Sequence, residues 1–87
     1  MGLRLRESIV RVIREKQDEF NISDRRLAEM SGLGRHYLQR RLDRALPFST
    51  EDLEAIATPL RMSVMELLLQ ARVLSQPDNA RVQAARR

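Results

Sequence analysis

Apolar residues recur at helical spacing in one segment after another of this 87-residue chain, and this pattern constrains the fold most strongly. Leu5, Ile9 and Ile13, for example, step by four, which places them on one face of a helix. Only 3 Gly and 3 Pro interrupt the pattern, and aromatic residues make up 3% of the chain. The expected core is therefore aliphatic, and the sequence predicts a small all-α domain.

Start and stop signals divide the pattern into five predicted helices. Ser23, Ser49 and Ser63 are good N-cap residues, and the last two are each followed by an acid three residues later. Gly32 stands where a helix end favours a left-handed conformation, and Phe20 is expected to fill the core after the first helix. The predicted helices span residues 3–19, 24–31, 35–43, 50–60 and 63 to about 75.

Several classes of protein are excluded by what the sequence lacks. There is no cysteine, hence no disulfide framework and no thiolate metal site. No apolar run is long enough for a membrane span or a secretory signal, so we expect a soluble, cytoplasmic protein. One histidine without a cysteine or an aspartate partner pattern makes neither a catalytic triad nor a metal cluster. We therefore predict no enzyme activity, no cofactor and no metal.

Positive charge is concentrated in one segment. The chain carries 16 Lys+Arg against 12 Asp+Glu, a net charge of +4. Within residues 24–44, six arginines face three acids, which gives +3 for that segment alone. Such a basic patch on a small domain favours a polyanion as partner, with a merely solvated surface as the alternative. Residues 1–76 are predicted to be the domain, and residues 77–87 a basic tail.

The basic segment also has the pattern of a helix-turn-helix. Ala28 lies where two helices approach each other closely, and Gly32 follows it four residues later in the turn. Leu33 and Leu38 then pack the second helix onto the first. A small residue, a glycine and two apolar residues at this spacing are what the packing of such a motif requires.

The sequence resembles the Cro/repressor (Xre-type) helix-turn-helix family, in the versions common in actinobacteria and their phages. The resemblance covers about residues 5–70 and depends on four runs in order: LAEMSGLGR (27–35), YLQRRL (37–42), PFSTEDLEAIA (47–57) and SVMELL (63–68). It implies a five-helix, lambda-repressor-like domain whose third helix enters the DNA major groove. The implied function is sequence-specific binding of a double-stranded DNA operator by a transcriptional regulator.

The resemblance also assigns roles to individual residues. Arg35 and His36 match the first base-reading positions, and Gln39 and Arg40 lie about one turn further along the helix. Asp24 stands where the family usually has Gln, and we expect it to hold Arg35 by a charge-assisted bond. The flanking residues are predicted to contact phosphate: Ser23, Arg25, Arg26, Tyr37, Arg41 and Arg44. Packing is the alternative for Tyr37, and solvated surface is the alternative for the arginines.

The sequence departs from the family pattern at two helix ends. Asp43 and Arg44 stand where Asn and Gly are frequent, so the helix that contains them is expected to end differently. Pro59 and Arg61 replace the usual Ala and Gly near the end of the fourth helix. Because proline has no backbone N–H, Pro59 removes one helical hydrogen bond and is expected to disturb that end.

Two apolar stripes run along the last predicted helix. One has the i, i+3, i+4, i+7 spacing of a core face: Val64, Leu67, Leu68 and Ala71. The other points away from it: Met65, Leu69 and Val73. A small domain cannot bury both faces of a terminal helix, so we predict that the second stripe forms a weak homodimer on a palindromic operator. The alternatives are that the stripe stays exposed or that the tail covers it through Val82.

Two functional alternatives stay open at this point. The protein is expected to be either a small Cro-like regulator or the DNA-binding part of a longer repressor. The rival class is an antitoxin-like or protein-interaction module that uses the last helix and the tail. A relative that keeps the fold only for protein docking is a weaker rival, because the six arginines of residues 24–44 argue against it.

Overall fold

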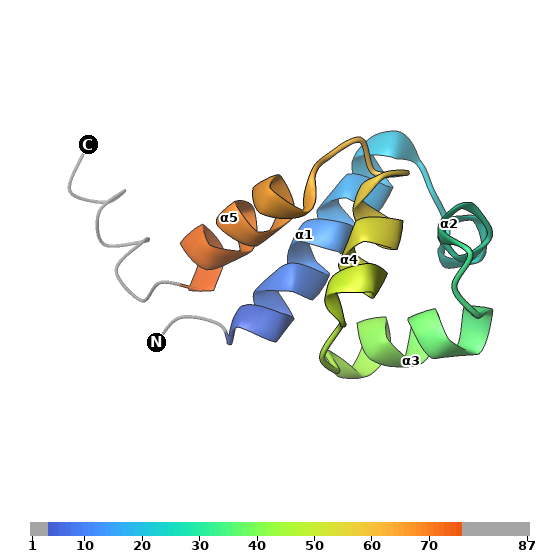
Figure 1. The fold of residues 1–87 in the computed structure, drawn as a ribbon, viewed down its shortest axis with the longest axis horizontal. Coiled ribbons are helices and arrows are strands. Elements are labelled where there is room, and N and C mark those ends of the chain that lie inside the picture. The colour runs from blue at the N-terminus through green and yellow to red at the C-terminus, as the bar shows by residue number, and fades with distance from the viewer. Residues whose placement is uncertain (1–3, 76–87) are drawn as a thin grey trace.

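The computed structural model describes residues 4–75, which form five α-helices and, within that range, no strand (Figure 1). They are α1 (Leu5–Phe20), α2 (Asp24–Ser31), α3 (Arg35–Arg44), α4 (Thr50–Ala57) and α5 (Val64–Ser75). The all-α prediction is confirmed. None of the described helices combines the length and apolar character that a bilayer crossing needs. Val82 and the predicted tail 77–87 lie outside the described residues.

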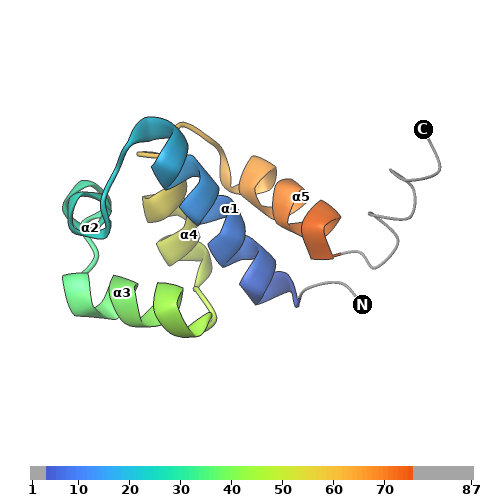
Figure 2. The same cartoon turned by 180° about the vertical axis from the view of Figure 1, so that it is seen from behind.

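The helices pack around one aliphatic core. α1 lies against α5 along most of its length, while α2 packs on α3 and α4. Figures 1 and 2 show α1 and α4 in the middle, with α5 on one side and the α2–α3 pair on the other. The largest completely buried core side chains come from all five helices and the turn after α4: Ile13, Leu27, Leu38, Ile56, Leu60 and Leu67. The core therefore holds the α2–α3 pair on a scaffold of three other helices.

The predicted starts of α2, α3 and α4 and the predicted stop at Gly32 are confirmed, whereas α1 begins at Leu5 and not at residue 3, and α5 begins at Val64, directly after its capping residue Ser63. Ser23 Oγ accepts a hydrogen bond from the backbone N–H of Arg26 at 3.1 Å. Ser63 has reciprocal bonds with Glu66, and Gly32 ends α2 with φ of 77°. Only a residue without a Cβ adopts this conformation at no cost. Local signals are therefore sufficient to set these boundaries.

Phe20 is not in the core, contrary to the prediction. α1 includes Phe20, and the chain turns only at Asn21, which has φ of 56°. The ring is half-buried at the surface, with the Arg61 guanidinium 5.0 Å and the Lys16 ammonium 6.0 Å from its centroid. A partly exposed aromatic ring with cations near it gains cation–π attraction in place of burial.

α4 is shorter than predicted and α3 is one residue longer. α4 ends at Ala57, because Pro59 cannot donate the next helical hydrogen bond. The chain then turns, with the Met62 N–H donating to the Ala57 carbonyl at 3.1 Å and with Arg61 at φ of 60°. α3 ends after Arg44, and Ala45 takes the left-handed conformation that a glycine would favour. Both departures from the family pattern therefore change a helix end.

Candidate nucleic-acid interface

α2, the turn after it and α3 form a compact helix-turn-helix. Ala28 is buried in α2, where a larger side chain would separate the helices. Leu33 in the turn is partly buried against the core, and Leu38 and Leu42 are the buried residues of α3. α3 is therefore anchored by one apolar face, and its opposite face is left to solvent.

The solvent-exposed surface of α3 carries the four residues predicted to read bases. Arg35, His36, Gln39 and Arg40 are all exposed. Their i, i+1, i+4, i+5 spacing places them on one side of α3. Among residues 4–75, none of the four has a side-chain hydrogen bond or ion pair, whereas most other charged side chains nearby have partners. Their donors are thus available to a ligand.

Four of the residues predicted to contact phosphate are placed around this face with donors to spare. Arg25 and Arg26 are exposed on α2 and have only loose ion pairs with Glu29, at 3.8 and 3.4 Å. Arg44 is exposed at the end of α3. The Ser23 oxygen accepts its capping bond, so its hydroxyl proton is left to donate. These groups can all contact an anion without breaking a strong internal bond.

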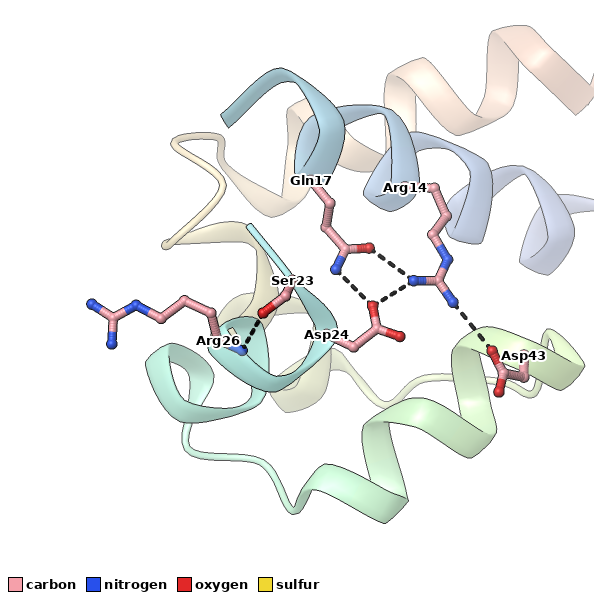
Figure 3. A network of polar contacts seen from close by, with 6 residues as sticks. All are labelled: Arg14, Gln17, Ser23, Asp24, Arg26 and Asp43. Atoms are coloured by element: carbon pink, nitrogen blue, oxygen red, sulfur yellow. Dashed lines mark hydrogen bonds and ion pairs between the residues drawn. The ribbon is translucent and has the colours of Figure 1, made fainter. Parts of the chain in front are cut away.

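The expected bond between Asp24 and Arg35 is wrong. Asp24 instead accepts hydrogen bonds on one oxygen from Arg14 at 2.5 Å and from Gln17 at 2.8 Å (Figure 3). Both donors come from α1. The Asp24 carboxylate therefore connects α2 to α1 and does not restrain Arg35.

Tyr37 and Arg41 both have partners within the protein. For Tyr37 this contradicts the assignment to phosphate, whereas the assignment of Arg41 stays a prediction, because only its Nη1 has a partner. The Tyr37 hydroxyl donates its proton to Asp52 Oδ2 at 2.6 Å. A phosphate oxygen only accepts hydrogen bonds, so the hydroxyl has no proton left for a phosphate contact. Arg41 stacks on the Tyr37 ring, 4.2 Å from its centroid, and donates to the Pro47 carbonyl at 2.7 Å. For Tyr37, packing was the open alternative, and it is what the structure shows.

The electrostatics of this contact follow from its buried carboxylate. Burial raises the pKa of Asp52, but the hydrogen bonds donated by Tyr37 and Ser49 outweigh burial and leave the pKa below its usual value. The same bond to Asp52 raises the pKa of Tyr37, and desolvation adds to the rise. The pair is therefore a neutral phenol and a carboxylate at neutral pH, which is a strong, charge-assisted combination.

Replacing Tyr37 by phenylalanine is expected to lower the melting temperature by roughly 5 °C at pH 7. The folded-state pKa of Asp52 is lowered from 3.8, so the contribution of the ionised pair is complete above that value. It is lost as the pH falls through the folded-state pKa. Thermal melts followed by circular dichroism should therefore show the gap between wild type and Tyr37→Phe narrowing as the pH falls below 3.8. A gap independent of pH would contradict the assignment.

Sequence reasoning missed three polar residues that organise the interface: Arg14, Gln17 and Asp52. The sequence pattern gives Arg14 and Gln17 no role, and it identifies Asp52 only as the acid that follows the N-cap Ser49. Their partners come from other helices, 7 to 29 residues away in sequence. No local spacing indicates such contacts, so no sequence signal was available for them.

The second apolar stripe of α5 is exposed, as predicted. Met65, Leu69 and Val73 are 67%, 59% and 50% exposed, while Leu67 and Ala71 are buried. An open hollow lined by Val12, Glu15, Gln70, Val73 and Leu74 adjoins the stripe between α1 and α5. α5, the helix that carries the stripe, lies on the other side of α1 and α4 from the α2–α3 pair (Figure 1).

Comparison with solved structures finds two similar chains, both crystal structures of the clp gene regulator ClgR from Corynebacterium glutamicum. The first shares 28% identity at a TM-score of 0.77 and covers 99% of this chain and 92% of that chain. The second shares 27% identity at a TM-score of 0.74 and covers 87% and 97%. No protein-family model matches the chain, and no curated protein does. The predicted five-helix fold is confirmed over nearly its whole length.

Proposed function

We propose that this chain, which has the lambda-repressor-like helix-turn-helix fold of the Cro/repressor family, is a sequence-specific, double-stranded-DNA-binding regulator of transcription. The observation that carries the proposal is the exposed face of α3, where four polar side chains have no partner among residues 4–75. The likeness to a bacterial gene regulator supports it. A cytoplasmic, nucleoid-associated location follows from this function.

The four exposed side chains have the chemistry that major-groove reading requires. The fork of the Arg35 guanidinium matches the two acceptors of a guanine, and the Gln39 amide matches the donor and acceptor of an adenine. His36 and Arg40 flank them on the same face. An α-helix fits the major groove, so one helix face can present all four groups to neighbouring base pairs.

Ser23, Arg25, Arg26, Arg41 and Arg44 are proposed to hold the DNA backbone. The N-terminus of α2 adds its unpaired N–H groups and dipole, which also favour phosphate. Tyr37 is left out of this set because its hydroxyl already donates to Asp52. Arg41 stays in the set, because within residues 4–75 only its Nη1 donates, to the Pro47 carbonyl, and the guanidinium has further donors.

Removing one phosphate-contacting charge is expected to change the salt dependence of binding and not the base preference. For Arg26→Gln, the slope of log affinity against log salt should decrease by about 0.9. Arg11→Gln is the matched control, since Arg11 is equally cationic but lies on α1 in an exposed pair with Glu15. Its slope should stay at the wild-type value. A changed consensus sequence for Arg26→Gln would show that this residue reads bases.

The operator is proposed to be palindromic and the protein to bind it as a weak homodimer through Met65, Leu69 and Val73. Three exposed apolar side chains on one helix form a patch that water solvates poorly. The patch is small, so the dimer should be weak in solution and be strengthened when both copies bind one DNA.

The test of the proposed function is selection of bound duplexes from a random DNA library by the full chain. A consensus with two inverted half-sites is the expected result. Salt titration on the consensus and on random duplex then measures the selectivity ratio. Absence of any enriched sequence would contradict the proposal and favour the interaction-module alternative.

A further inference from the structure

One guanidinium connects α1 to both helices of the helix-turn-helix (Figure 3). Arg14 Nη1 donates to Asp24 Oδ1, and Arg14 Nη2 donates to Asp43 Oδ1 at 3.2 Å. Gln17 accepts from Arg14 at 3.2 Å and donates to the same Asp24 oxygen. The network therefore joins three helices through one side chain.

The two carboxylates sit at particular ends of their helices. Asp24 is the first residue of α2, and Asp43 is the last but one residue of α3. These are the ends remote from the turn at Gly32. The turn thus connects the two helices on one side, and Arg14 connects them on the other.

No interaction within α3 favours a carboxylate at position 43. A negative charge near a helix C-terminus opposes the helix dipole. Asp43 is also four residues after Gln39 and seven after His36, on the face proposed to read DNA, where phosphates would repel it. Arg14 neutralises this charge and draws the carboxylate toward α1.

The other contacts of α3 lie on its α2, core and α4 sides, the last through the Tyr37–Asp52 and Arg41–Pro47 bonds, whereas Arg14 is its polar connection to α1 within residues 4–75. Among the described helices, only α2 packs extensively on it, and Leu38 and Leu42 anchor it to the core. An ordinary surface ion pair would add little. This network differs from such a pair because Gln17 is only 4% exposed and braces the Asp24 side. Supporting residues that are themselves buried and hydrogen-bonded hold the residues that contact a ligand in the required geometry.

We propose that Arg14 is a positioning residue for DNA reading, which sets the orientation of α3 by holding Asp43 and Asp24 at once. The proposal rests on the proposed function. It makes selectivity for the operator depend on a residue that contacts no base.

The experiment compares wild type with Arg14→Gln on the selected operator and on random duplex. Selectivity, the ratio of the two affinities, should fall about tenfold, while the affinity for random duplex changes less than about threefold. Arg14→Lys keeps the charge but lacks the planar fork that grips two carboxylates, so its selectivity should be intermediate. Arg11→Gln should leave selectivity unchanged.

A double-mutant cycle keeps the test valid even where Arg14→Gln folds poorly. Asp43→Asn removes only the α3 branch and should also lower selectivity, and the double variant should be no worse than Arg14→Gln alone. Equal losses on both DNAs, full rescue by Arg14→Lys, or additive losses would each overturn the proposal. A wild type without selectivity would overturn the proposed function itself.

Discussion

Replacing Leu69 by glutamate is expected to lower the affinity for a duplex with two half-sites by about 100-fold. Leu69 is the central member of the exposed stripe and is 59% exposed. A carboxylate there would place two like charges across the proposed two-fold axis. Linked binding of the second half-site would then be lost, and the affinity should approach that for a single half-site. Sedimentation and titration of both duplexes measure the change.

The matched control for this substitution is Gln70→Glu, which adds the same charge to the next exposed position of α5. It should leave both mass and affinity close to wild type. Because Leu69 is exposed, Leu69→Glu should alter the free energy of unfolding by less than about 0.5 kcal/mol, so loss of folding does not confound the result. Unchanged mass and unchanged two-site affinity would rule out α5 as the dimer contact.

Replacing Arg35 by alanine is expected to cost about 1–3 kcal/mol of binding free energy on the operator. The loss on random duplex should be much smaller, since random DNA offers only the charge interaction. Arg35 is the first residue of α3, and its side chain has no partner within residues 4–75, so no internal bond is broken by the change. Titration of operator and random duplex under one salt condition provides the comparison.

Arg35→Lys separates the guanidinium fork from the charge. A lysine keeps the positive charge but cannot place two donors in the fixed geometry that a guanine edge accepts. Its salt dependence should match wild type while its preference at one base pair relaxes. Equal losses on operator and random duplex for Arg35→Ala would instead make Arg35 a phosphate contact.

Local chemistry made much of the fold predictable. Ser23 and Gly32 define the two ends of α2 through hydrogen bonds that span at most four residues. The predicted range 24–31 is therefore the observed one. The sequence predicted that Pro59 would disturb the end of α4. It did not predict that the helix would end before Pro59, at Ala57, instead of at residue 60. The predicted position of Phe20 in the core was wrong because it was inferred from hydrophobicity alone. The cationic groups of Lys16 and Arg61 lie near the ring and stabilise it at the surface.

The candidate interface could be predicted for side chains that have no partner within the protein. It could not be predicted for side chains whose partners lie on other helices. The exposure of His36 and Arg40 follows from the helical period of α3, which places them away from Leu38 and Leu42. The partner of Asp24 does not, because Arg14 lies ten residues earlier on another helix. Tyr37 likewise depends on Asp52, fifteen residues later, whose position only the packed structure determines.

The double role of Asp52 makes the corner between α3 and α4 stiff. Its carboxylate caps α4 through Ser49 and holds Tyr37 of α3, while Arg41 fastens the Pro47 carbonyl between them. In the proposed dimer, the separation of the two reading helices is therefore built into the protein. An operator with half-sites slightly too near or too far must twist or bend to fit. The cost of that distortion depends on the base pairs between the half-sites, so the protein would select sequence at positions that no side chain touches.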